Sequence, residues 1–147
     1  MSKFTCLVLC VVAASLSSVH VTRADKPTLR DNLRPILDEC AKEFPGVSNE
    51  DVDKAVESGD STSLHRCFNG CVFKKAGFIN NKGEYDLKTG LTNLRKAVSD
   101  DEEYNKLVKV TTQCTSVKDP VSDGEEGCER GTQLSLCILR SKSVVLI

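Results

Sequence analysis

Residues 64–78 read LHRCFNGCVFKKAGF and contain two cysteines, Cys67 and Cys71, four positions apart. The apolar residues of this stretch recur at helical spacing, so we predict a helix here. Residues four apart share one helix face, with Cβ atoms about 5–6 Å apart, whereas a disulfide requires about 3.5–4.5 Å. Cys67 and Cys71 are therefore not expected to bond each other, and each must reach a different segment.

Four more cysteines lie beyond the first 39 residues: Cys40, Cys114, Cys128 and Cys137. Six cysteines in a short chain with a secretory leader predict a disulfide framework. Cys128 and Cys137 are nine positions apart, which places them on opposite sides of a continuous helix at about 100° per residue. Dropping every pairing that joins neighbours 67–71 or 128–137 leaves ten of the 15 connectivities, and spacing alone does not choose among them. Such cross-linking is expected to tie at least four helices together.

Residues 1–24 have the form of a signal peptide. A short basic start is followed by an apolar stretch, Phe4–Leu16, and by small residues that fit cleavage after Ala24. The apolar run is shorter than the roughly 20 residues that span a bilayer. We therefore expect a secreted, extracellular protein without stable membrane insertion. Cys6 and Cys10 leave with the leader, so that eight cysteines become six.

The mature chain, residues 25–147, has a length that suits one domain. Without Lys3 and Arg23, 18 basic residues face 21 acidic ones, a formal charge of −3. There is no basic block, no Trp and only 5% aromatic residues. Nucleic-acid binding therefore lacks its electrostatic footprint, and no nucleic-acid partner is expected.

Apolar residues recur with helical period through most of the mature chain, and strand-like alternation is nearly absent. Ser48, Ser99 and Ser122 each stand three positions before an acidic residue, as at the start of a helix with a capping box. We predict an all-α fold, a compact bundle of about six short helices. The apolar stripes cover residues 29–44, 52–56, 64–72, 87–98, 104–114 and 128–138.

Three disulfides are more than a helical chain of this length needs in order to bury an adequate core. Extracellular durability is one explanation. The other is a hollow core: a ligand cavity of about 300 Å³ costs on the order of 7 kcal/mol at roughly 24 cal/mol per Å³. Three disulfides at about 2–4 kcal/mol each offset such a cost. We therefore expect an apolar cavity inside the bundle.

The cysteine pattern resembles that of the insect odorant-binding proteins: one cysteine, a long gap, C-x3-C, a long gap, then C-x8-C. Residues 67–79 look like the third helix of that family, with its glycine stop at Gly77. Gly83-Glu-Tyr-Asp86, followed by the stripe from Leu87 to Val98, is similar to its short turn and fourth helix. The resemblance covers essentially the whole mature chain.

This resemblance implies a six-helix fold around a buried apolar pocket. It also implies three interlocked bridges, which here are Cys40–Cys71, Cys67–Cys128 and Cys114–Cys137. The implied function is reversible carriage of a small apolar molecule, such as a volatile alcohol, aldehyde, ester or fatty acid, through aqueous secretions. A chemosensory receptor is a further partner that this function suggests.

The walls of the expected pocket are predicted on the apolar faces of the helices, although any one of these residues can instead be plain core packing. Two of the predicted wall residues, Tyr104 and Thr111, carry a hydroxyl group that can form a hydrogen bond with the ligand. For Thr111 we favour a bond back to its own helix. The predicted ligand-contacting residues are Phe68, Val72, Leu91, Leu94, Tyr104, Leu107, Val108, Thr111 and Leu134.

The chain ends with four apolar residues, Val144-Val-Leu-Ile147, which are unusual on a water-exposed terminus. Our hypothesis is a lid, with Val145, Leu146 and Ile147 as a wall of the pocket and the terminal carboxylate as an acid-sensitive latch. Deleting residues 144–147 is then expected to change ligand affinity and flatten its pH dependence. The alternatives are a frayed tail or a homodimer contact.

His65 stands beside Cys67 and raises the question of metal or catalytic chemistry. In an oxidising compartment the cysteine thiols form disulfides, and one histidine does not complete a zinc ligand set. No metal and no cofactor are therefore expected. No nucleophile, base and orienting group occur together, so we predict that the protein is not an enzyme. A small secreted phospholipase would pair its histidine with an aspartate, whereas Arg66 follows His65 here.

Other secreted binding folds fit the cysteine spacing less well. Saposin-like proteins carry close cysteine pairs at both ends, and plant-type lipid-transfer proteins carry adjacent cysteines, which this chain lacks. The alternative function is that of a secreted interaction protein of the same fold, a salivary or seminal factor that binds a partner protein or host mediator.

Overall fold

The computed structural model describes residues 27–116, 124 and 126–141. These residues form six α-helices, which confirms the all-α prediction, and their one β-type feature is an isolated antiparallel bridge between Ile79 and Tyr85. The helices are α1 (Leu29–Glu43), α2 (Asn49–Ser58), α3 (Arg66–Ala76), α4 (Leu87–Ala97), α5 (Asp101–Thr115) and α6 (Cys128–Arg140).

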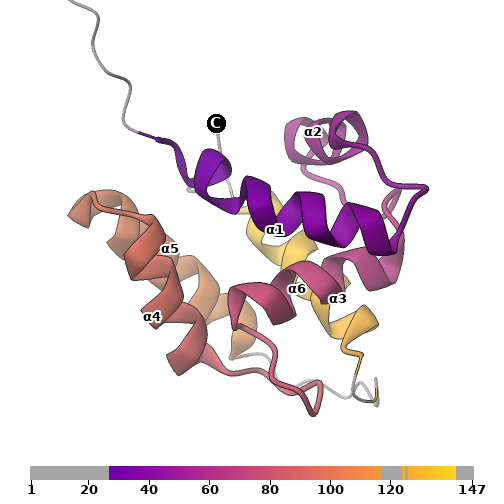
Figure 1. Cartoon of the computed structure of the whole chain (residues 1–147). Helices are drawn as coiled ribbons and strands as arrows, with labels where there is room; N and C mark the ends of the chain where they lie inside the picture. The colour runs from indigo at the N-terminus through magenta and orange to yellow at the C-terminus, as the bar shows by residue number, and fades with distance from the viewer. Residues whose placement is uncertain (1–26, 117–123, 125, 142–147) are drawn as a thin grey trace, which may run out of the picture.

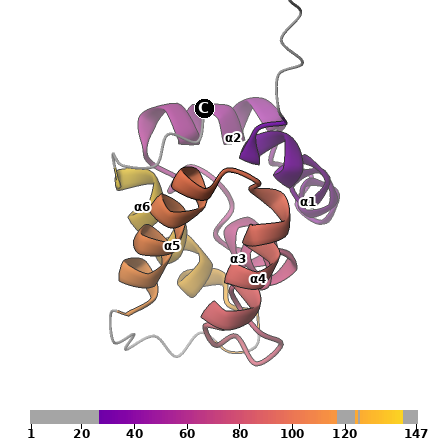
Figure 2. The same ribbon diagram turned by 90° about the vertical axis from the view of Figure 1, so that its left-hand side faces the viewer.

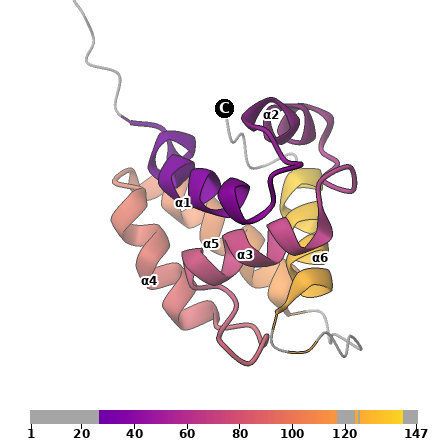
Figure 3. The ribbon, with the colours of Figure 1, turned by 45° about the vertical axis from the view of Figure 1, so that its right-hand side comes forward.

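The centre of the molecule is the crossing of α3 and α6, the two helices that pack together most extensively among those described. α4 and α5 lie together on one side of this crossing, and α1 passes across α3 (Figures 1 and 3). Figure 2 shows α2 across the top of the molecule and α1 at its upper right. Helices that are distant in sequence therefore meet around α3.

Glycine makes the close crossing of α3 and α6 possible. A Cβ atom added to Gly131 of α6 would lie 2.5 Å from the backbone nitrogen of Gly70 in α3, and one added to Gly70 would lie 2.9 Å from the carbonyl oxygen of Gly127. These distances are too short for any side chain, and the neighbouring atoms are backbone atoms that cannot rotate away. The two helices thus pack backbone against backbone.

Three disulfides fix this arrangement, and they are the bridges that the resemblance implies: Cys40–Cys71, Cys67–Cys128 and Cys114–Cys137. Cys67 and Cys71 bond different partners, as their spacing on one helix face predicts. α3 is tied to α1 and to the start of α6, and α6 is tied to α5. Four of the six helices are therefore cross-linked directly.

The helix starts agree with the sequence analysis in one case and differ in two. Ser48 caps α2, and its hydroxyl and the Asp51 carboxylate form the predicted capping box. The predicted cap Ser99 is wrong: the carboxylate of Asp100 accepts the Glu103 N–H at 2.8 Å, so α5 begins one residue later.

The predicted start of α6 at Ser122 is also wrong, because α6 begins at Cys128; Ser122 itself lies outside the described residues. Gly124 and Gly127 both adopt positive φ angles, of 64° and 62°, which a continuous helix does not allow. The bridge from Cys128 to Cys67 then fixes the first residue of α6 against α3.

Buried apolar side chains form three clusters. The first joins α1, α2 and α3 around Cys40, Ala55 and Phe68. The second joins α4, α5 and α6 around Val110 and Leu134, and the third joins α1, α4 and α5 around Leu107. The first cluster leads directly to the candidate site.

Candidate ligand-binding site

A partly enclosed cavity of about 120 Å³ lies between α1, α2, α3 and α6. Its wall is almost entirely apolar, and its polar lining is limited to four side chains. The lining residues are Arg30, Leu33, Leu37, Val52, Ala55, Val56, Ser61, Leu64, Phe68, Asn69, Val72, Phe73, Ser135, Ile138 and Leu139.

Helical spacing directs several of these side chains to one place. Phe68 and Val72 are four positions apart in α3, so they share one face of the helix, and Leu64 reaches the cavity from the loop before α3. Phe68 is only 2% exposed. In α6, Ser135, Ile138 and Leu139 lie on a common face for the same reason. The cavity thus lies where the apolar faces of four helices meet without filling the space between them.

The turn after α2 closes one end of the cavity. Gly59 ends the helix in the left-handed region at φ 68°, and its N–H donates to the carbonyl groups of Ala55 and Val56. The Asp60 carboxylate then accepts the Thr62 N–H at 2.8 Å. This hydrogen bond is the main cause that lowers the pKa of Asp60 below its usual value of 3.8. An ionised aspartate therefore shapes the loop beside the cavity.

Charged groups near the cavity are paired. The Arg30 guanidinium at the edge of the cavity forms an ion pair with Asp53 of α2. On the outer surface, Lys75 bonds Glu39 and Glu43 of α1, and the bond to Glu39 is the main cause that raises the pKa of Lys75. Among the described lining residues, none therefore offers an unpaired charge to a ligand.

Two of the predicted ligand-contacting residues, Phe68 and Val72, line this cavity. The other seven that are described do not line it. Leu91, Leu94 and Leu134 pack in the cluster of α4, α5 and α6, and Leu134 is fully buried. Their role as ligand contacts remains a prediction.

The remaining predicted residues lie on α5. Leu107 and Tyr104 pack in the cluster with α1 and α4, while Val108 is half-buried. The hydroxyl of Tyr104 donates to the carbonyl oxygen of Leu91 at 3.4 Å, and that of Thr111 donates to the carbonyl oxygen of Leu107 at 2.7 Å. Both hydroxyl groups therefore have protein partners, and the bond of Thr111 to its own helix is the one that the sequence favours. Val145, Leu146 and Ile147 lie outside the described residues.

The sequence analysis selected none of the cavity residues on α1 and α2. Leu33, Leu37, Val52 and Ala55 belong to stripes that were recognised as helical. The Cys40–Cys71 bridge, which the family resemblance implies, could have indicated that α1 borders the cavity. This bridge holds α1 against α3, the helix that carries Phe68.

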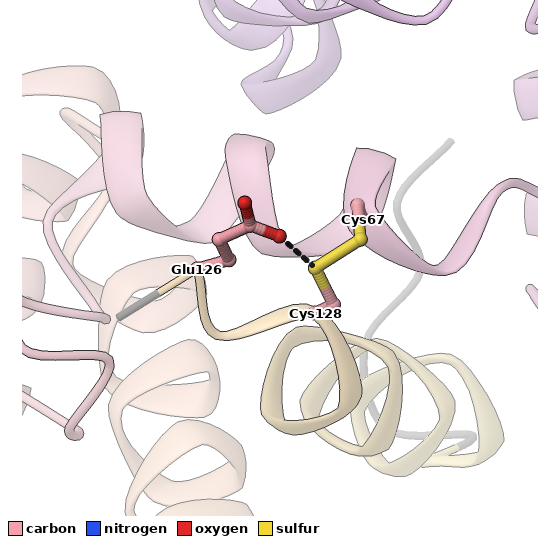
Figure 4. Close-up of side chains that lie close together, drawn as sticks. All are labelled: Cys67, Glu126 and Cys128. Carbon is pink, nitrogen blue, oxygen red and sulfur yellow. Dashed lines mark hydrogen bonds between the residues drawn. A yellow bond between two sulfur atoms is a disulfide. The ribbon is translucent and has the colours of Figure 1, made fainter. Parts of the chain in front are cut away.

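One group of described side chains has the composition of a metal site: Cys67, Glu126 and Cys128. Figure 4 shows that the two cysteines are joined as a disulfide, with a Glu126 carboxylate oxygen 3.5 Å from the Cys128 sulfur. A disulfide sulfur carries no proton and is not the thiolate that binds zinc. His65 is also engaged, because its Nδ1 accepts the Cys67 N–H and its ring stacks on Phe44 at 4.9 Å.

Comparison with known proteins fits this arrangement of six helices, three bridges and an apolar cavity. A model of the PBP/GOBP family matches residues 22–141, which include all six helices and all six bridged cysteines. The chain belongs to the PBP/GOBP family. This is the family of insect odorant- and pheromone-binding proteins, and the resemblance drawn from the cysteine pattern is confirmed. No curated protein and no solved structure gives a significant match.

PBP/GOBP proteins are small secreted carriers that bind hydrophobic molecules, and the family is one of binding proteins, not of enzymes. In the described part of this PBP/GOBP chain, each helix is too short or too polar to cross a membrane. Family membership thus gives the kind of function, that of a small carrier.

Proposed function

We propose that this protein is a secreted carrier that reversibly binds a small hydrophobic molecule in the cavity between α1, α2, α3 and α6. The observation that carries the proposal is the apolar wall of this cavity in a chain of the odorant-binding family. A small apolar molecule gains affinity by leaving water, and the few polar groups on the wall orient it.

The size of the cavity supports a small guest. Its volume of about 120 Å³ is less than half of the value assumed from the sequence, and is close to the roughly 150 Å³ of an engineered cavity that binds benzene. At roughly 24 cal/mol per Å³, an empty space of this size costs about 3 kcal/mol. One disulfide, at about 2–4 kcal/mol, offsets such a cost. The framework of bridges thus supports a stable empty state as well as a filled one, which reversible carriage requires.

Secretion and the partners remain predictions. Three disulfides agree with an oxidising, extracellular compartment. The signal peptide of residues 1–24 lies outside the described residues, and so does the tail that suggested a homodimer contact. A chemosensory receptor would receive the ligand from the carrier; the receptor is inferred from the function alone.

Displacement of an apolar fluorescent probe tests the function. Guests of about benzene's size are expected to displace the probe, and Ala55→Leu, which fills the cavity from α2, is expected to weaken probe binding about tenfold or more. Ala97→Leu is the matched control, because the same change at the end of α4 lies outside the cavity lining. Absence of probe binding, or equal binding by both variants, would contradict the proposal and favour a protein partner instead.

A further inference from the structure

An open groove of about 580 Å³ runs beside the end of α1, along α3 and to the start of α6. It is separate from the apolar cavity, since the two linings share no residue. Three of the six bridged cysteines line the groove: Cys67, Cys71 and Cys128. Two of the three disulfides therefore border a space that a small molecule can enter.

The chemistry open to a disulfide at such a place is exchange with a thiol. A thiolate bonds to one sulfur, and the other sulfur leaves with the electron pair of the broken bond. The rate depends on access to the attacked sulfur and on the stability of the leaving thiolate. A thiolate is stabilised in the first turn of a helix and destabilised in apolar surroundings. The three bridges of this protein differ in both properties.

Two of the bridges would release a thiolate into an apolar core. Cys40 is fully buried in the same cluster as Cys71, so attack on Cys71 from the groove must expel it there. Cys114 is 7% exposed in the cluster of α4, α5 and α6, and it stands in the last turn of α5, where the helix dipole disfavours negative charge. Its partner Cys137 is exposed, but attack on Cys137 must expel Cys114. The leaving groups therefore protect both bridges.

The Cys67–Cys128 bridge has different surroundings. Neither cysteine belongs to the three apolar clusters of the described residues. Cys67 is the second residue of α3 and Cys128 is the first residue of α6, a helix that begins at Gly127 without a side-chain cap. A thiolate on either cysteine is therefore stabilised by a helix dipole. Cys67 is half-buried and Cys128 is 4% exposed, so Cys67 is the sulfur that an incoming thiol attacks.

We propose that the Cys67–Cys128 bridge is a site of thiol exchange, which small thiols entering the groove open before the other two bridges. The incoming thiolate bonds to the Cys67 sulfur, the S–S bond breaks, and Cys128 leaves as a thiolate that takes a proton from water. A second thiolate then attacks the mixed disulfide and releases Cys67, which is protonated in turn. The protein bridge is reduced, and the two small thiols are oxidised to their disulfide. This inference goes beyond the carrier function and does not depend on it.

Glu126 is the acidic residue next to this bridge. One of its carboxylate oxygens lies 3.5 Å from the Cys128 sulfur (Figure 4), and Glu126 lines the groove. The other acidic residue of the lining, Glu43, is paired with Lys75. The charge of Glu126 opposes both the thiolate that approaches and the thiolate that forms on Cys128. Glu126 therefore slows the exchange.

The test follows the order in which the bridges open. The folded, unaltered protein is incubated with reduced glutathione, samples are alkylated at intervals, and mass mapping of the peptides identifies the labelled cysteines. We expect Cys67 and Cys128 to be labelled first, about tenfold faster than the other four cysteines. Labelling of Cys114 and Cys137 first, as exposure alone would give, or of all six together, would overturn the proposal.

A second measurement tests the role of Glu126. Glu126→Gln is expected to speed the opening about 3- to 10-fold, the size of a Coulomb interaction at this distance in water, and the gain is expected to shrink at high salt. Glu103→Gln is the matched control, because Glu103 is an exposed glutamate in the first turn of α5 and lies outside the groove lining. Equal rates for the two variants would overturn the role of Glu126.

Discussion

The inward faces of α3 and α5 both carry an apolar stripe at helical spacing, but their surroundings differ. On α3, Phe68 and Val72 border a cavity. On α5, Leu107 packs in a cluster with Leu29 and Val98, and the hydroxyl of Thr111 bonds its own helix. An amphipathic stripe therefore shows which way a helix face points, but it does not show whether neighbouring helices fill the space in front of it.

The difference arises from how the helices are held apart. A seven-residue connection from Gly59 to His65 joins α2 to α3, and the side chains of α2 at the cavity are the small Val52, Ala55 and Val56. α4 and α5 face each other across a short connection and carry the larger Leu91, Leu94 and Tyr104. The following experiments test this contrast between the cavity side and the α4–α5 side.

The largest expected effect is the loss of the bridge between α3 and α6. Cys67 and Cys128 are 61 positions apart and Cys114 and Cys137 are 23 apart. By loop-closure entropy, replacing the first pair by serine destabilises the protein by about 4 kcal/mol and replacing the second by about 3 kcal/mol. Denaturant unfolding of the two double variants measures both values. A larger loss for Cys114 and Cys137 would show that the α5–α6 side depends more on its bridge than the cavity side.

The next effect concerns the contact of α3 with α6. Gly131→Ala is expected to destabilise the fold by about 3 kcal/mol, because the added methyl group meets the backbone of Gly70 and the helices must move apart. Gly46→Ala is the control, since a Cβ there meets nothing within 4 Å and its φ angle is not positive. Equal midpoints of urea unfolding for both variants would show that the crossing tolerates separation.

Local signals made much of this fold predictable from the sequence. Apolar periodicity located all six helices, and Ser48 with Asp51 marked the start of α2. The start of α6 was missed because its position depends on a tertiary event, the bonding of Cys128 to Cys67 after two glycines with positive φ. The capping pattern at Ser122 is a local feature of the sequence, and it gives no information about the bridge between Cys67 and Cys128.

The site was less predictable than the fold. One of its four polar residues, Ser61, stands in a loop that apolar periodicity does not describe, although it is only 1% exposed. Leu33 and Val52 lie on recognised stripes, but nothing in the spacing distinguishes a residue that borders a cavity from one that fills a core. Cavities depend on the distances between helices, and these are set by side chains from several segments at once.

Adding volume on each side tests the contrast directly. Val72→Phe is expected to fill part of the cavity, weakening binding of the apolar probe about tenfold while changing stability by less than about 1 kcal/mol. Leu107→Phe, at a position that is only 4% exposed, is expected to destabilise the protein by about 2 kcal/mol and leave probe affinity unchanged. Probe titration and thermal unfolding of both variants give the four values. Loss of binding in Leu107→Phe alone would move the ligand to the α4–α5 side.

The smallest effect on stability and ligand binding is expected from lowering the pH. Hydrogen bonds from the Thr62 N–H to Asp60 and from the Thr89 N–H to Asp86 are the main causes that lower the pKa of each carboxyl below 3.8. Each carboxylate therefore contributes stability that is fully present well above pH 3.8 and is lost as the pH falls through the lower value of the folded state.

Because Asp60 holds the loop that carries Ser61 at the cavity wall, its protonation is expected to weaken guest binding as the pH falls below 3.8, whereas Asp86 at the start of α4 affects folding alone. Asp60→Asn replaces a charge-assisted hydrogen bond by a neutral one, so affinity at pH 7 is expected to fall on the order of twofold and to vary less between pH 3 and 7. Asp86→Asn is the matched control, and its affinity profile is expected to follow that of the unaltered protein. If Asp60→Asn and Asp86→Asn gave the same dependence of affinity on pH, the Asp60 carboxylate would have no influence on ligand binding.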